Sequence, residues 1–251
     1  MAKIIILGSS NALASKGHEN AYMVITGEER TVLVDSPHNP ILRLDDIGVD
    51  YNDVTDLILT HFHPDHVSGI PLFLMDMWLR GRKNPLEIYG LDHALSRLEN
   101  LMDAFTWDQW PEFFPVTFNR IPSKKYTPLL KSDDFDIYAS EVRHMIPTIG
   151  VRVEFKGSGK IAIYSCDTEP CEEVVQLAKG ADVLIHEASG AFKGHSSSKQ
   201  AAEVASKAGV EKLYLIHYPT GEYWQENLLD DARSHFGGDV ELAEDLMVLE
   251  F

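Results

Sequence analysis

The sequence is poor in cysteine, in basic side chains and in long apolar runs, and each shortage excludes a class of protein. Two cysteines in 251 residues, Cys166 and Cys171, are too few for a disulfide framework, so we expect both to be reduced. Lys and Arg number 22 against 39 Asp and Glu, and the net charge of −17 argues against a broad phosphate-binding surface. No stretch reaches the roughly 18 apolar residues of a membrane span, and the opening MAKIIILGSS is too short an apolar run for a signal peptide. We therefore expect a cytoplasmic protein that engages no membrane.

The length and the alternation of apolar runs predict one large α/β domain over residues 1–251. The chain is 44% hydrophobic, enough to fill a sizeable core, and no linker or repeat divides it. Short Ile- and Val-rich runs bounded by turn residues predict strands over 3–8, 21–26, 31–35, 56–60 and 86–89, and again throughout 135–166 with a turn at 156–160. Helical spacing of apolar residues predicts helices over 67–80 and 91–105. The last third alternates predicted helices at 171–179, 196–208 and 226–236 with predicted strands at 182–186, 213–217 and 247–251.

Residues 60–66, THFHPDH, concentrate side chains that bind metal ions. His61, His63, Asp65 and His66 follow an apolar run, and the three histidines are part of a total of 11 in the chain. Imidazole and carboxylate are common ligands of zinc-like ions, and histidines two apart on extended backbone point the same way. A surface loop with incidental histidines is the alternative. The spacing favours the interpretation that this segment forms half of a metal site.

Three further candidate ligands stand at the ends of predicted strands. His144 follows IYASEVR, Asp167 ends IAIYSCD, and His217 ends LYLIH. One histidine at a strand end is more often a hydrogen-bonded structural residue than a ligand. Because the same position recurs three times, and loops at strand ends gather functional groups, we predict that these residues share a site with the first cluster.

Together these motifs resemble the metallo-β-lactamase superfamily, and within it the ribonuclease Z branch. The signatures span the chain: LVDSP with Asp35, THFHPDH, VRHMIPTIGVRVE with His144, SCDT with Asp167, and LIHY with His217. Two more segments, HEA at 186–188 and GHSS at 194–197, resemble elements of the ribonuclease Z branch. The resemblance implies a four-layer αβ/βα sandwich, with two mixed sheets flanked by helices and metals bound in loops at one edge of the sheets.

The resemblance also implies two divalent metal ions per chain. Zinc is the favoured ion, and manganese or iron are alternatives that suit the same ligands. His61, His63 and His144 would hold one ion, Asp65, His66 and His217 would hold the other, and Asp167 would bridge them. Two cations that share a carboxylate and a water lower the pKa of that water and supply hydroxide near neutral pH. Asp65 would double as a proton acceptor. Asp35 would orient a histidine ring, with turn capping as its alternative role.

Two residues are expected to act on the leaving group. His195 resembles the family histidine that faces the scissile phosphate and protonates the leaving oxygen, and Glu187 would orient its ring. The same segment also has the pattern of a turn and an N-cap before an amphipathic helix, with Ser196 as the cap. His186 ends an apolar strand and is predicted to be structural.

The expected activity is hydrolysis of phosphodiester or related ester bonds by a metal-bridged hydroxide, on a small ester or an RNA 3′ end, in a homodimer. Ribonuclease Z usually carries a flexible tRNA-gripping arm between the equivalents of His144 and Asp167. Here Asp167 follows His144 by 23 positions, filled by a predicted hairpin, so the arm is absent. The main alternative is tRNA 3′ processing itself. Less favoured alternatives are an arylsulfatase- or lactonase-type esterase and a diiron oxidoreductase on the same fold.

Two other segments have open roles. Arg80, Arg82 and Lys83 in RGRK either touch a nucleic-acid backbone or, as we favour, offset the carbonyl end of a helix dipole. WDQWPEFFP, 107–115, is rich in aromatic rings and either lines an apolar pocket, where it would bind an aryl ester or stack bases, or belongs to a dimer contact or a satellite core.

Overall fold

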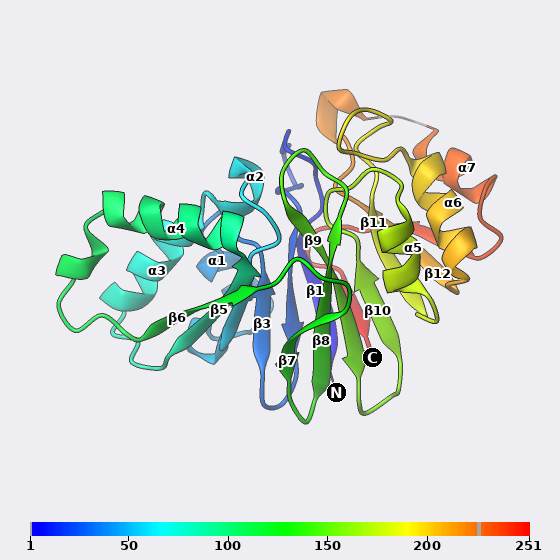
Figure 1. Ribbon diagram of the computed structural model, residues 1–251. Helices are drawn as coiled ribbons and strands as arrows, with labels where there is room; N and C mark the ends of the chain where they lie inside the picture. The colour runs from blue at the N-terminus through cyan, green and yellow to red at the C-terminus, as the bar shows by residue number, and fades with distance from the viewer. Residues whose placement is uncertain (1, 225–226) are drawn as a thin grey trace.

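Two mixed β-sheets pack face to face in the computed structural model, which describes residues 2–224 and 227–251 (Figure 1). The first sheet has the order β14-β1-β2-β3-β4-β5-β6. Its strands are β1 (Lys3–Gly8), β2 (Tyr22–Thr26), β3 (Thr31–Val34), β4 (Asp56–Ile58), β5 (Leu86–Leu91), β6 (Val116–Ile121) and β14 (Val248–Glu250). The second sheet has the order β13-β12-β11-β10-β9-β8-β7. Its strands are β7 (Thr127–Lys131), β8 (Phe135–Val142), β9 (Thr148–Phe155), β10 (Ile161–Tyr164), β11 (Val183–Glu187), β12 (Lys212–Ile216) and β13 (Asp239–Leu242).

Helices cover the outer face of each sheet. The first sheet carries α1 (Ile41–Asp46), α2 (Pro64–Val67), α3 (Ile70–Leu79) and α4 (Asp92–Ala104), and the second carries α5 (Glu172–Ala178), α6 (Ser198–Ala208) and α7 (Leu228–Arg233) (Figure 1). Short 3₁₀ turns lie at Tyr51–Asp53, Trp107–Gln109 and Gly221–Tyr223. The predicted four-layer αβ/βα sandwich is confirmed. Among the described residues, each helix is too short or too polar to cross a membrane.

Strand β1 shows why the first apolar run forms a central strand. Ile4 and Ile6 enter the core between the two sheets, whereas Ile5 and Leu7 pack into the core under the helices. Successive side chains of a strand point to opposite faces, so a strand buried on both faces is apolar throughout. The unbroken IIIL run therefore places β1 inside the sheet.

Each sheet is antiparallel in one half and parallel in the other. Strands β14 to β3 pair antiparallel and β3 to β6 parallel, while β7 to β10 pair antiparallel and β10 to β13 parallel. Parallel strands end at the same edge of their sheet, so the loops that follow them gather there. This edge carries the residues predicted to bind metal.

The helix predicted over 67–80 is two helices, α2 and α3. Gly69 separates them, and a Cβ atom at this position would lie 1.9 Å from the carbonyl oxygen of His38. The backbone therefore passes directly against the loop after β3, where only glycine fits. The predicted helix over 226–236 begins at Leu228 and ends at Arg233, and its expected first residue, Glu226, lies outside the described residues.

The RGRK segment is structural. Arg82 is buried and donates hydrogen bonds to five backbone carbonyl oxygens, those of Tyr51, Asn52, Val54, Asn84 and Pro85. Arg80 pairs with Asp76 at 2.7 Å, and Lys83 pairs with Glu112 at 3.0 Å. A nucleic-acid contact by Arg82 is therefore wrong, because its guanidinium is already committed inside the protein.

The aromatic segment 107–115 packs largely as a satellite of the core under α3 and α4. Phe114 is buried, and Trp107 and Phe113 pack against the same apolar cluster. Trp110 stacks on Trp78 with ring centroids 5.0 Å apart. Stacking of this kind is worth about 0.5–1.5 kcal/mol beyond area burial, so the rings stabilise the α3–α4 layer.

Candidate metal centre

The seven predicted ligands converge at one edge of the sandwich, from loops that follow strands of both sheets. The first cluster follows β4 and continues into α2, and the other three side chains follow β8, β10 and β12. Four donors so close in sequence can reach one site because the backbone is extended at His63 and then enters α2. The turn at this point brings Asp65 and His66 back to the edge where His61 and His63 lie.

One group of donor atoms is formed by His61, His63, His144 and Asp167. The Nδ1 atom of His63 lies 3.1 Å from the Nε2 atoms of both His61 and His144. The Oδ2 atom of Asp167 lies 3.9 Å from the same two Nε2 atoms. Zinc binds nitrogen and oxygen at roughly 2.0–2.2 Å, so donor atoms at these separations fit around one ion.

A second group is formed by Asp65, His66, His217 and Asp167. The Oδ2 atom of Asp65 lies 3.4 Å from His217 Nε2 and 3.7 Å from His66 Nε2. The Oδ1 atom of Asp167 lies 3.5 Å from both of these nitrogens. The two oxygens of Asp167 therefore face two different groups of donors, which is the placement of a bridging carboxylate.

Unpartnered polar atoms at the centre of the cluster test whether the residues fit metal ions. His66 Nε2 and Asp167 Oδ1 are buried and have no hydrogen-bond partner among the described residues. An unsatisfied buried polar group costs on the order of 1–3 kcal/mol, and a charged group costs more. Divalent cations would satisfy both atoms, so the donor set fits divalent metal ions.

The remaining ring nitrogens are held by hydrogen bonds to the protein. His66 Nδ1 contacts Asp35 Oδ2 at 2.8 Å, which confirms that Asp35 orients a histidine ring. Asp35 also accepts hydrogen bonds from the backbone and hydroxyl of Thr60. His144 Nδ1 donates to the Gly194 carbonyl oxygen at 2.6 Å, and His217 Nδ1 lies 2.7 Å from Ser189 Oγ. Such partners fix the ring orientation and leave Nε2 for a metal.

The electrostatics keep Asp167 charged and His61 neutral. Burial opposes ionisation of Asp167, but His217 and His66 hold its pKa well below the usual range. Burial, together with the neighbouring His66, lowers the pKa of His61 well below its ordinary value. Metal ligands must be deprotonated, and the protein supplies both groups in that form.

Three non-glycine residues at this edge adopt the left-handed backbone conformation. They are Asp35, Cys166 and His217, with φ values of 63°, 53° and 53°. Each directly follows or lies near the end of a strand that feeds the site. This conformation is rare for such residues and costs of order 1 kcal/mol or more each, and it clusters at functional sites. The sequence carries no signal for it.

His195 and Glu187 lie beside the metal-binding cluster. His195 Nδ1 is 2.9 Å from Glu187 Oε1 and 4.0 Å from Asp167 Oδ2. Glu187 is fully buried and also accepts hydrogen bonds from the backbone amides of Thr168 and Ser189. Burial disfavours the charged ring, but the hydrogen bond and charge of Glu187 outweigh it and raise the pKa of His195. The geometry fits a positioned proton donor.

Two neighbouring predictions have different outcomes. Ser197, and not Ser196, caps α6, in a capping box with Gln200, while Ser196 Oγ donates to the Thr168 carbonyl oxygen at 2.7 Å. Ser196 therefore ties the His195 loop to the Asp167 loop. His186 is buried outside the cluster, and burial lowers its pKa to about 4, which agrees with a structural role for a neutral ring.

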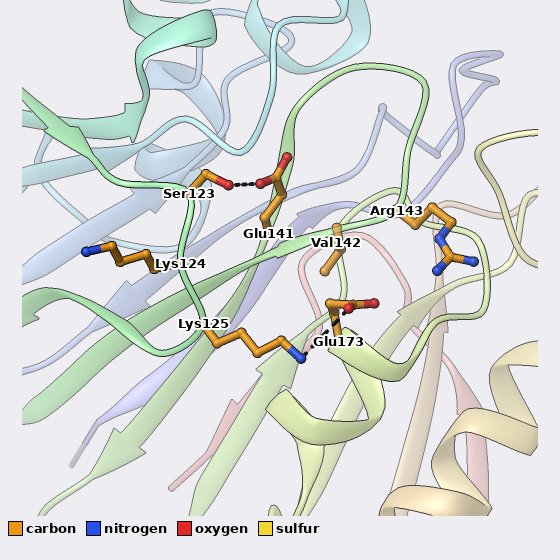
Figure 2. Close-up of a pocket in the computed structure, with 7 residues that line it drawn as sticks. All are labelled: Ser123, Lys124, Lys125, Glu141, Val142, Arg143 and Glu173. Carbon is orange, nitrogen blue, oxygen red and sulfur yellow. Dashed lines mark hydrogen bonds and ion pairs between the residues drawn. The ribbon is translucent and has the colours of Figure 1, made fainter.

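A cavity of about 350 Å³ adjoins the residue before His144 (Figure 2). Its lining residues come from the loop before β7, the end of β8 and α5: Ser123, Lys124, Lys125, Glu141, Val142, Arg143 and Glu173. Glu141 is hydrogen-bonded to Ser123, and Glu173 lies 3.8 Å from Lys125. Lys124 and Lys125 are adjacent in the chain and meet Arg143 only in the folded protein, so the sequence does not reveal this basic patch of Lys124, Lys125 and Arg143.

The segment between His144 and Asp167 forms β9 and β10, joined by a tight turn. Ile161 pairs with Glu154 at the closed end of this hairpin. The hairpin stays within the second sheet (Figure 1). The predicted absence of a protruding arm is confirmed.

Fold and site together define the class, a metal-dependent hydrolase of the metallo-β-lactamase fold. The family model described as anti-Pycsar protein Apyc1 matches residues 2–236, and the chain belongs to that family. Ribonuclease Z of Methanothermobacter thermautotrophicus is 29% identical, with 100% of this chain and 97% of the relative covered.

Solved structures agree on the fold. The metallo-β-lactamase fold protein YhfI from Bacillus subtilis superposes with a TM-score of 0.83 at 21% identity, covering 100% of this chain and 99% of the other. Human tRNase Z, short form, superposes with a TM-score of 0.78 at 23% identity, covering 99% and 98%. The chain is a ribonuclease Z-like hydrolase, as its motifs predicted.

Proposed function

We propose that this chain is a dinuclear, zinc-dependent phosphodiesterase that acts on small diesters, linear or cyclic. The observation that carries the proposal is the bridging placement of Asp167, whose two oxygens face two complete sets of donors. Two divalent ions held by these donors would lower the pKa of a shared water and neutralise the charge that develops on the phosphoryl oxygens.

The side chains around the ions have distinct roles in this proposal. His61, His63 and His144 would hold one ion, Asp65, His66 and His217 would hold the other, and Asp167 would be shared between them. Asp65, whose side chain is 16% exposed, would accept the proton of the attacking water. His195 protonates the departing oxygen. Glu187 orients the His195 ring through the 2.9 Å hydrogen bond.

A small substrate is favoured over a folded RNA on two grounds. The hairpin between His144 and Asp167 carries no arm. The net charge of −17 repels a polyanion at long range, whereas a small diester carries a single negative charge. The missing arm and the negative net charge therefore both favour a compact anion as the substrate.

Metal content and substrate turnover test this proposal together. We expect about two zinc ions per chain in freshly purified protein. Bis-p-nitrophenyl phosphate, a dinucleoside phosphate and a cyclic mononucleotide should be hydrolysed, with activity lost on chelation and restored by zinc. An aryl sulfate and a lactone should turn over far more slowly. Metal-loaded protein that hydrolyses none of the diesters would refute the proposal, and a coloured, redox-active protein would point to the diiron alternative.

A second candidate function, cleavage of an RNA 3′ end, is supported by the identity to ribonuclease Z and by the basic cavity beside His144. In this candidate function, Lys124, Lys125 and Arg143 would contact a flanking phosphate of an extended substrate and would offset part of the long-range repulsion. The single-domain organisation, the homodimer and the cytoplasmic location remain predictions.

The salt dependence of RNA binding separates the two functions. If RNA crosses the basic cavity, the logarithm of its binding constant falls with the logarithm of the salt concentration. Lys124→Ala should make this slope shallower by about 0.7–0.9, which is the contribution of one phosphate contact. Lys160→Ala, which removes one exposed charge at the distant β9–β10 turn, should leave the slope unchanged. Specific cleavage of a precursor-tRNA trailer at physiological salt must accompany this result. Equal slopes in both variants, with intact small-diester turnover, would reject the RNA function.

A further inference from the structure

A cavity of about 500 Å³ adjoins His195. Its lining residues come from the segment after β10, from the loop before α6 and from α6 itself: Glu169, Pro170, Ala191, Phe192, Lys193, His195 and Gln200. A hollow of this size accommodates an aromatic ring or a nucleobase. His195 is the one lining residue that is also placed in the proposed reaction.

Phe192 lines this cavity with an exposed aromatic ring. Its exposed fraction is 56%, and its ring centroid lies 4.8 Å from that of His195, with the planes inclined at 49°. A single exposed apolar residue is ordinary. An exposed ring in contact with the proposed proton donor is a more specific arrangement, because the two residues line the same cavity.

The loop that carries Phe192 is held by its own backbone. The Gly190 amide donates to the Ser196 carbonyl oxygen at 2.9 Å, and the His195 amide donates to the Phe192 carbonyl oxygen at 3.0 Å. Gly190 has φ of 139°, and a Cβ atom there would lie 2.7 Å from the Phe192 ring. The Phe192 ring therefore requires glycine at position 190, because a larger residue would clash with it. The hydrogen bonds of the loop hold the ring in one position.

The role of His195 as a proton donor indicates which part of a substrate this cavity would bind. A general acid must lie within hydrogen-bond reach of the oxygen that it protonates, so the group attached to that oxygen extends past His195. The cavity that Phe192 lines adjoins His195. We propose that it is the leaving-group subsite, and that Phe192 selects leaving groups bearing an aromatic or nucleobase ring by stacking on them. This inference rests on the proposed function of His195.

Ligand binding tests the subsite without requiring turnover. The probes are phenylphosphonate and methylphosphonate, whose dissociation constants for zinc-loaded protein are measured by calorimetry. Aromatic stacking is worth about tenfold in affinity. We expect the phenyl compound to bind about tenfold more tightly to the natural protein and to Phe192→Trp, and this preference to fall close to onefold in Phe192→Ala.

A matched control lies in an apolar hollow between α3 and α4. Phe105 is 51% exposed there, beside Leu72, Met75, Leu101 and Trp110. Phe105→Ala should keep the full preference for the phenyl compound. If Phe105→Ala abolishes the preference and Phe192→Ala does not, or if the natural protein shows none, the proposal is overturned.

Kinetics then separate the subsite from the reaction. In Phe192→Ala the KM for bis-p-nitrophenyl phosphate should rise about tenfold while kcat changes little, because stacking contributes to binding in the ground and transition states alike. A Phe192-dependent binding preference in a protein that hydrolyses no ester would show that the cavity binds aryl groups, but it would refute the proposed function and with it the leaving-group assignment. Ester hydrolysis whose KM does not depend on Phe192 would support the proposed function and refute the subsite.

Discussion

Asp167→Ala should lose metal and activity together. The purified variant is expected to hold fewer than one zinc ion per chain, and kcat/KM for bis-p-nitrophenyl phosphate should fall by about 10³-fold or more. The reason is that one side chain faces both sets of donors at 3.5–3.9 Å, so its removal opens both sites at once. Metal stabilisation of developing charge is worth several kcal/mol, and each 1.36 kcal/mol is tenfold in rate.

The control for this prediction is Asp108→Ala, which removes an exposed carboxylate from the 3₁₀ turn at the start of the aromatic segment 107–115. Its metal content and rate should match those of the natural protein. Circular dichroism of both variants checks that the fold is intact. Two bound zinc ions and near-normal turnover in Asp167→Ala protein would contradict the bridging role, whatever the substrate proves to be.

The metal-binding residues were predictable because their signal is local. In 61–66 the donors are near neighbours in the chain, and His144, Asp167 and His217 each follow an apolar run that forms a strand. Strands β8, β10 and β12 run in the same direction, although β8 lies in the antiparallel half of its sheet, so their C-terminal ends reach one edge. Strand prediction therefore carries spatial information, and donors at these strand ends are expected to share one site.

Other parts of the site depend on tertiary contacts and leave little trace in sequence. The break between α2 and α3 follows from the approach of the His38 carbonyl oxygen to Gly69, a contact between segments about thirty positions apart. Propensity alone extends one helix across that point. The basic patch joins Lys124 to Arg143 only after β7 and β8 have paired. Strand β13 (Asp239–Leu242) is short and partly polar, so it is defined by its pairing with β12.

The scaffold concentrates energetic costs at the edge where the metals are proposed to bind. Asp35 and His217 have strained backbones there, and His66 Nε2 and Asp167 Oδ1 are buried without partners among the described residues. Such costs persist only when the surrounding structure fixes them. Apolar strands packed on both faces provide that rigidity for the loops that carry the donors.

The proposed role of His195 predicts a loss of activity that depends on the leaving group. In His195→Ala, kcat/KM for a dinucleoside phosphate should fall by about 10²–10⁴-fold, the usual contribution of general acid catalysis. Hydrolysis of bis-p-nitrophenyl phosphate should fall only a few-fold. A ribose oxygen leaves as a strongly basic alkoxide unless it is protonated, whereas p-nitrophenolate is a stable anion and leaves without a proton. Both rates are measured on protein with verified zinc content.

Comparison with two other variants distinguishes proton donation from metal binding and from simple packing. Asp167→Ala should lower both rates by similar factors, because the metals serve both substrates. Glu187→Gln keeps the shape of the residue that lies 2.9 Å from His195 but removes its charge, and should show the same leaving-group dependence as His195→Ala with a smaller amplitude. Equal losses on both diesters in His195→Ala protein would remove His195 from proton transfer and leave it as a residue that merely shapes the site.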